Sequence, residues 1–495
     1  MTDRPPPTAP TIANRLAIVW LLVPLAAVIP LAAGRPTLAV AAGGATAVLL
    51  ASASRPRWAL LALAAIYPFQ LLLLALVLHL GAPEKLTRYS GEWAEVAVAG
   101  MVLAGIRVWV ERRSRIEWID WCGIVYLAVV VAYRFLASTV LHHGPISASA
   151  LDTSLRNDTM FVVIFLAVRR LGPDRTASRR FAAVVFAVGL ITSATAVFEY
   201  LRSSTWNHFV VYDLWTTVYE VKVLGVAVPN VVDIREYDFH GRLLTGSVFL
   251  DRLAFSLYLV MAIAIGCRYL CGTTRFRYLI GAGTLLIGTG LILAQSRDAV
   301  AAAVVAAVLI VRPLWREGRA RRIRLLSATG LTVVVLVPVA FAVGFASRTS
   351  SALAGTDPST RLHESRSASG LEAFLASPLG RGLGTGGTNG TRFGISGTIV
   401  NEDSYLQIAN ETGILSLLPF VALTITGIVM LIRRARAPDQ PDLPYAWQGA
   451  FLGLSLACLG LTVWLELPVA VTAWMGLGLS LPVVVSRREA VAASV

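Results

Sequence analysis

Residues Leu291–Ile310 read LILAQSRDAVAAAVVAAVLI. Apolar residues fill both arms of this stretch, and the polar tetrad Gln295–Asp298 separates them. Inside a membrane, backbone N–H and C=O groups have no water to bond, so apolar arms form helices whose hydrogen bonds are internal. The stretch therefore predicts two membrane helices joined by a tight polar turn that carries an arginine.

Apolar runs of this kind recur along the whole chain. The chain has 495 residues, of which 56% are hydrophobic and 15% are charged. A run of about 20 apolar residues crosses the hydrocarbon core of a bilayer as a helix, and we identify about 14 such runs. We therefore predict an all-α fold, a polytopic membrane helix bundle with two long extracytoplasmic loops.

The predicted segments differ sharply in composition. They are a disordered cytoplasmic tail (1–15), transmembrane helices 1–7 (16–201), an extracytoplasmic loop (202–243), transmembrane helices 8–11 (244–346), a large extracytoplasmic loop with a short helix and a Gly-rich turn (347–403), transmembrane helices 12–14 (404–485) and a cytoplasmic tail (486–495). The eighth helix is expected near Leu244–Cys271, and the short loop helix at Ser359–Ala376. Long loops in a compact fold are usually functional.

Arginine sets the orientation of the bundle. The net charge is +14, and the basic residues gather in alternate connections such as Arg107–Arg115 and Arg312–Arg324. Cytoplasmic loops of membrane proteins carry an excess of Lys and Arg, so we place these connections and both termini in the cytoplasm. The positive charge is thus a topology signal, and we expect a lipid bilayer, not a nucleic acid, as the partner.

Arg297 and Arg242 lie at the outer ends of predicted helices. Charge beside hydrocarbon is costly and usually functional. The planar guanidinium group bonds two phosphate oxygens and keeps its charge, which makes both arginines candidates for binding a diphosphate. Asp298 could orient Arg297, and Gly246 would allow a close approach to the backbone. The alternative for Arg297 is a plain hairpin turn with a snorkelling arginine.

The large outer loop adds further candidates. Its stretch DPSTRLHESRSASGLEAFLASPLG contains Arg361, His363 and Arg366. The two arginines are candidate diphosphate ligands, and His363 is a candidate base. The alternative is a solvated helix face for all of them. The glycine run at 377–390 lacks the Gly-Lys-Ser/Thr ending of a Walker motif, and a flexible linker is the alternative reading.

Glu402 and Asp403 precede the helix predicted to begin near Ser404. A carboxylate within reach of an acceptor hydroxyl can take its proton, so both are candidate catalytic residues together with Arg297. The alternative is ordinary helix capping. No Asp-x-Asp pattern and no cysteine quartet predicts a metal site, and we expect neither a metal nor a cofactor.

Four blocks in the second half of the chain resemble the O-antigen ligase and O-antigen polymerase superfamily of integral membrane glycosyltransferases. Arg242–Gly246 is similar to the family's Arg-x3-Gly, and Gln295–Asp298 to its Ser-Arg segment at an outer hairpin. Arg361 with Pro378–Gly384 is similar to the family's Arg followed by Pro-Leu-hydrophobic-Gly-x-Gly. Glu402–Ile414 resembles its His-Asn-x-Tyr-Leu through Glu-x-Gly-hydrophobic, with Glu402 in place of the histidine and Asp403 in place of the asparagine.

The resemblance implies a polysaccharide polymerase or ligase of a bacterial cytoplasmic (inner) membrane. It would move a glycan from undecaprenyl (polyprenyl) diphosphate to a hydroxyl of a glycan or lipid-glycan acceptor at the outer face. The transfer would invert the anomeric centre without a metal, because arginines would stabilise the leaving diphosphate. The alternative is a flippase or polysaccharide exporter, in which the same arginines bind the lipid-linked oligosaccharide without chemistry.

Overall fold

A computed structural model describes residues 22–112, 115–136, 146, 148–172, 175–202, 245–271, 276–312, 336–341, 343–355, 358–387, 390, 393, 395, 398–436 and 442–483. In chain order the helices are α2 (Leu22–Ala32), α3 (Pro36–Ser54), α4 (Pro56–Ile66), α5 (Gln70–His79), α6 (Glu84–Ser90), α7 (Trp93–Arg112), α8 (Trp118–Tyr133), α10 (Ala148–Leu171), α11 (Arg175–Leu201), α14 (Arg252–Cys271), α15 (Arg277–Leu293), α16 (Arg297–Val311), α18 (Phe345–Leu353), α19 (Pro358–Ala376), α21 (Ser404–Ala435), α22 (Asp442–Ala457) and α23 (Leu467–Ser480). Three 3-10 turns join them: η1 (Tyr67–Phe69), η3 (Ser247–Phe249) and η5 (Val463–Leu465).

Every regular element in these described ranges is a helix, which confirms the all-α prediction. Six described segments are long and apolar enough to cross a membrane: Pro36–Ser54, Pro56–His79, Glu84–Arg112, Arg175–Leu201, Arg252–Cys271 and Ser404–Ala435. The chain therefore has the fold of a helical membrane protein. The total of about 14 spans stays a prediction. Most of the first outer loop, and with it Arg242, lies outside the described residues.

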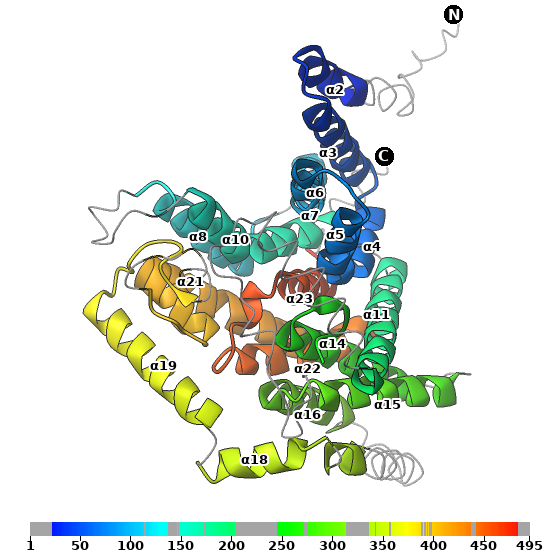
Figure 1. The fold of residues 1–495 in the computed structure, drawn as a ribbon, viewed down its shortest axis with the longest axis vertical. Coiled ribbons are helices and arrows are strands. Elements are labelled where there is room, and N and C mark those ends of the chain that lie inside the picture. The colour runs from blue at the N-terminus through cyan, green and yellow to red at the C-terminus, as the bar shows by residue number, and fades with distance from the viewer. Residues whose placement is uncertain are drawn as a thin grey trace, which may run out of the picture.

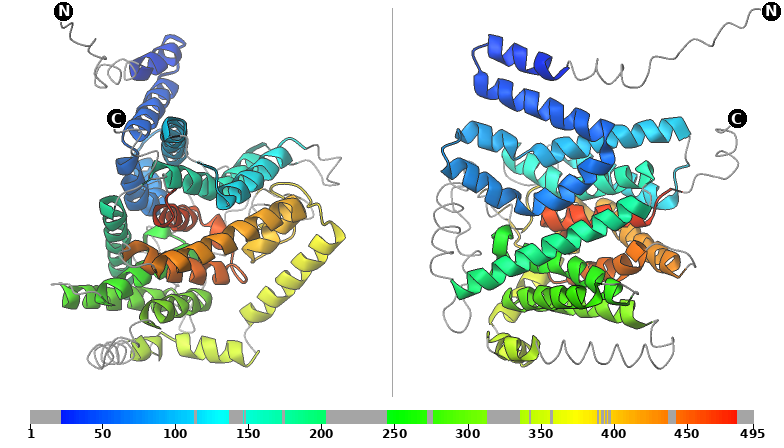
Figure 2. Two further views of the ribbon diagram at one scale, coloured as in Figure 1. Left: turned by 180° about the vertical axis from the view of Figure 1, so that it is seen from behind. Right: turned by 90° about the vertical axis from the view of Figure 1, so that its right-hand side faces the viewer.

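The helices form a stack around a buried centre. Figure 1 shows α14, α22 and α23 in the middle, with α2 and α3 projecting at one end and α18 at the other. Figure 2 shows, in its right-hand view, most helices lying side by side across the stack. The main packing pairs are α16 with α22, α10 with α23, α8 with α21 and α14 with α16. Helices far apart in sequence thus meet at the centre.

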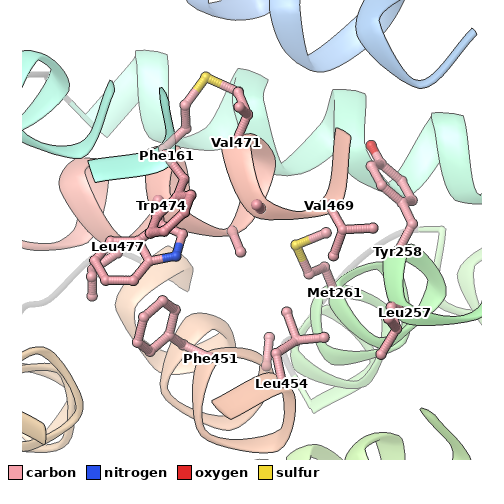
Figure 3. Close-up of a cluster of buried hydrophobic side chains, with 14 of the residues drawn as sticks. Phe161, Leu257, Tyr258, Met261, Phe451, Leu454, Val469, Val471, Trp474 and Leu477 are labelled. Atoms are coloured by element: carbon pink, nitrogen blue, oxygen red, sulfur yellow. The ribbon is translucent and has the colours of Figure 1, made fainter. Parts of the chain in front are cut away.

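Aromatic side chains fill that centre. Trp474 on α23 is fully buried, and its ring centroid lies 5.3 Å from those of both Phe161 and Phe451. Figure 3 shows these three side chains together, with Leu477 beside them. Each aromatic pair adds about 0.5–1.5 kcal/mol beyond its buried area. Helix α23 is apolar and buried all round, as expected for the central helix of a bundle.

Two predicted spans are interrupted. The helix expected near Leu244–Cys271 begins only at Arg252, because η3 and a turn occupy the residues before it. The predicted continuous helix from Ser404 is broken at Gly413, whose φ of 71° and ψ of −170° are not helical. Both interruptions lie near the predicted outer face, next to the candidate residues.

Candidate functional site

The starts of α14, α16 and α21 gather around the connection between α22 and α23. Ser404, the first residue of α21, donates its backbone N–H to the Cys458 carbonyl over 3.0 Å and its hydroxyl to the Leu461 carbonyl over 3.0 Å. Asp298 of α16 faces the same connection, because a Cβ built on Gly460 would lie 3.7 Å from its Oδ1. Helix starts carry positive partial charge, so this region favours an anion.

A strained turn delivers the start of α14. Ser247 and Leu250 have φ values of 53° and 62°, which non-glycine residues rarely adopt. Buried Glu199 fixes the turn by accepting the Ser247 N–H at 2.8 Å. A Cβ on Gly246 would lie 2.8 Å from the Leu250 carbonyl carbon. The close approach expected at Gly246 is therefore made by the chain's own turn, which ends at Asp251 and Arg252.

A second strained residue delivers the start of α16. Gln295 has a φ of 53° and is the third described non-glycine residue with positive φ. Its amide donates to the Val343 carbonyl over 2.7 Å, and Ser296 caps the helix by accepting the Ala299 N–H. Such strain costs about 1–3 kcal/mol per residue and collects at functional sites. Both strained turns lead directly into an arginine and an aspartate.

Helix α19 covers this region from the side. Figure 1 shows it along the edge of the molecule between α18 and α21. It is anchored near its middle, where the side-chain amide of Asn410 donates to the Gly370 carbonyl over 2.9 Å. The helix confirms the prediction made for Ser359–Ala376. His363 and Arg366 are three residues apart, so they lie on the same face of α19.

Both side chains converge on one carboxylate. Glu402 accepts a hydrogen bond from Arg366 Nη1 at Oε1, and its Oε2 contacts His363 Nδ1. The three side chains are 19%, 35% and 34% exposed, so the group is shielded but still reachable. The loop helix is thus tied by an imidazole and a guanidinium group to the residue just before the cap of α21.

Electrostatics joins this triad to the two helix starts. Burial lowers the pKa of His363 below its ordinary value of 6.5, and the positive charges of Arg297, Arg366 and Arg252 lower it further. Asp298 acts in the opposite direction and raises it. Three residues from two other helix starts, Arg252, Arg297 and Asp298, therefore lie within electrostatic range of the triad His363, Arg366 and Glu402. We call these residues together the arginine site.

The structure brings together five of the predicted residues: Arg297, Asp298, His363, Arg366 and Glu402. It gives Asp403 a different task, because this buried side chain caps α21 by accepting the N–H groups of Tyr405 and Leu406 at 2.7 and 2.9 Å. Burial raises the pKa of Asp403, and these two hydrogen bonds oppose the rise. The capping alternative is therefore the one observed for Asp403.

Arg361 does not join the arginine site. It is exposed, and its Nε donates to the Gly355 carbonyl over 3.0 Å. Residues two and five positions apart on a helix point in different directions, which separates Arg361 from His363 and Arg366. The predicted role of Arg361 in holding a diphosphate has no support from its position.

Arg252 lies within electrostatic range of His363, although the sequence did not select it as a site residue because it can also be read there as a structural charge. A helix beginning near Leu244 would place Arg252 two turns inside it. The actual cap is Asp251, whose Oδ1 accepts the Leu253 N–H at 2.8 Å. An aspartate before an apolar run is a helix-start signal. This signal at Asp251 predicts a helix that begins at Arg252, as α14 does.

The glycine-rich stretch is a folded turn seated in the break of α21. Arg381 and Gly382 donate their N–H groups to the carbonyls of Asn410 and Glu411 at 2.7 and 2.9 Å. The side chain of Glu411 accepts the N–H groups of Gly384 and Gly386 at 3.1 and 3.3 Å. The turn thus bonds groups that the helix break would leave unpaired. Glu411 is structural, and the stretch is not a flexible linker where it is described.

Known proteins add no assignment to this geometry. Comparison with protein-family models gives no match to the chain, and comparison with curated proteins gives none either.

Proposed function

We propose that this protein is a membrane glycosyltransferase. It would move a glycan from a polyprenyl-diphosphate-linked donor to an acceptor hydroxyl at the outer face of a bacterial cytoplasmic membrane. The observation that carries the proposal is the arginine site: three guanidinium groups within electrostatic range of a histidine that contacts a carboxylate. These are the groups that a diphosphate leaving group and a hydroxyl nucleophile require.

The arginines supply the electrostatic part of the reaction. Arg252 and Arg297 stand at helix starts, where the helix dipoles also favour negative charge. They would bind the diphosphate of the donor and stabilise its growing charge as the bond to the anomeric carbon breaks. The backbone turns that hold them are fixed by Glu199 and Gln295, so the charges are in place before the substrate arrives.

His363 is the base in this proposal. Its Nδ1 lies against Glu402 Oε2. In this proposal the carboxylate holds the proton on Nδ1, which leaves a lone pair on Nε2. A lowered pKa keeps the imidazole neutral at pH 7. Nε2 would take the acceptor proton as the acceptor oxygen attacks the anomeric carbon and the diphosphate leaves from the opposite side. One such displacement inverts the anomeric centre, and Glu402 acts as a positioning residue.

The test uses purified protein in nanodiscs. Native mass spectrometry with undecaprenyl diphosphate measures binding of the leaving group, and lipid-linked glycan extracted from the source organism measures turnover. We expect Arg252→Ala to lose both. Arg107→Ala is the control, because Arg107 forms an exposed ion pair with Glu111 on α7. Donor that crosses vesicle membranes but is never cleaved would overturn the proposal in favour of an exporter.

A further inference from the structure

A second polar cluster lies at the outer ends of α7 and α10. Arg156 Nη1 and Glu95 Oε1 are 3.4 Å apart, and their side chains are 40% and 26% exposed. The Tyr67 and Trp93 rings meet edge to face, with centroids 6.2 Å apart. The side-chain amide of Gln70 donates to the Gly91 carbonyl, one turn before Glu95, over 2.8 Å. We call Tyr67, Gln70, Trp93, Glu95 and Arg156 the Glu95 cluster.

Hydrogen-bonding capacity in this cluster is left unused. Glu95 Oε2, Gln70 Oε1 and Arg156 Nε are buried atoms without a hydrogen-bond partner among the described residues. A buried polar group without a partner costs about 1–3 kcal/mol. The three side chains come from different helices, and each is already held by one bond at its other polar atom. Two acceptors and one donor are therefore held in place without a partner of their own.

The charges in the cluster disfavour an anionic ligand. Glu95 balances Arg156, and Glu92, one turn away along the chain, adds a negative charge that acts on Glu95. An uncharged ligand with several hydroxyl groups fits better, because a hydroxyl both donates to carboxylate and amide oxygens and accepts from guanidinium. Trp93 is half-buried beside these groups and offers an apolar surface to ring C–H bonds. A sugar ring has all these features.

We propose that the Glu95 cluster binds an uncharged sugar ring. Helix α5 and turn η1 pack against η3, whose strained turn leads into Arg252. The elements that carry Tyr67 and Gln70 therefore contact the turn that precedes Arg252. The further assignment of this sugar to the glycan of a substrate rests on the proposed transferase function, whereas binding of the sugar itself does not.

Saturation-transfer NMR on the protein in nanodiscs tests the binding directly. The probes are glucose, galactose, mannose, N-acetylglucosamine and rhamnose, each added without any lipid-linked donor. We expect saturation transfer to at least one of them. Glu95→Gln and Arg156→Gln should each weaken binding about tenfold or more, the effect of losing one charge-assisted hydrogen bond. The matched control is Arg107→Gln, which breaks an exposed Arg–Glu pair on the same helix α7.

A charge reversal separates a binding role from a packing role. Glu95→Arg combined with Arg156→Glu restores an ion pair between α7 and α10, so it should restore thermal stability but not sugar binding. Recovery of both would show that the pair only holds the helices together and would overturn the proposal. Absence of saturation transfer from all five sugars to the wild type would overturn it as well. Retained sugar binding in Arg297→Ala, with transfer lost, would keep the two sites distinct.

Discussion

Two clusters of arginine and carboxylate occur at opposite ends of the helices. The first of them, which we call the inner clamp, joins the first turn of α8 to the last turn of α10, on the side predicted to be cytoplasmic. Arg169 there is bonded to Asp120 and Glu117, and Asp120 also accepts from Arg170 at 2.6 Å. The side chains of Arg169 and Asp120 are 1% and 0% exposed.

The arginine site differs from this inner clamp in exposure and in backbone geometry. In the inner clamp, Arg169 and Asp120 are paired with each other and almost completely buried. In the arginine site, the side chains of His363, Arg366 and Glu402 are 34%, 35% and 19% exposed. Strained residues precede Arg252 and Arg297. A closed network of ion pairs fastens helices, whereas a partly exposed group of arginines leaves room for an anionic ligand.

Among the substitutions that test this difference, the largest effect is expected on protein stability and comes from the inner clamp. Arg169→Ala leaves Asp120 charged and buried without its main partner, which should cost about 3–5 kcal/mol of unfolding free energy. Thermal unfolding in detergent measures the loss. An unchanged unfolding temperature would mean that the ion pairs of the inner clamp do not stabilise the fold.

The second-largest effect is expected on the transfer rate and comes from a substitution in the arginine site. Arg297→Ala should lower the transfer rate by about 10²–10³-fold, the usual result of removing one group that stabilises the leaving charge. Unfolding in detergent should stay close to that of the wild type. Turnover of lipid-linked donor checks the first part. A variant that unfolds like Arg169→Ala would erase the distinction between the two clusters.

The pH dependence of transfer sharpens the role of His363. Burial and the neighbouring arginines lower its pKa, so the neutral, proton-accepting form persists below the ordinary value of 6.5. We expect the rate to stay level from neutral pH down through 6.5 and then to fall about tenfold per pH unit below the shifted pKa. The profile of rate against pH should lose this acidic limb in His363→Gln. An unchanged limb would assign the base to another group.

The smallest effect is expected on the exposed face of α19. Arg361→Ala should change the transfer rate less than about twofold, because single surface substitutions cost within about 0.5 kcal/mol. Arg366→Ala, five residues along the same helix, should lower the rate strongly because it releases Glu402. The two rates, measured side by side, show whether position on the helix decides function. Equal losses would return Arg361 to the site.

The sequence predicted the secondary structure around the site better than it predicted which residues make up the site. The hairpin at Leu291–Ile310 appeared as expected, with α15 ending at Leu293 and α16 beginning at Arg297. The sequence left Asp403 open between a catalytic and a capping role and did not select Arg252, because a cap and a ligand are both charged residues at a helix start. Only neighbours in space distinguish them: Asp403 bonds its own helix, while Arg252 acts on His363 of a distant one.

The sequence by itself determined that the chain is helical and suited to a membrane, and it indicated which ends of the helices face each side. These properties are local, because run length and flanking arginine act within single helices. Only the tertiary structure decided that His363 meets Glu402 and that a glycine turn fills the break at Gly413. Such contacts join residues far apart in the chain, so they depend on how whole helices pack and not on any local pattern.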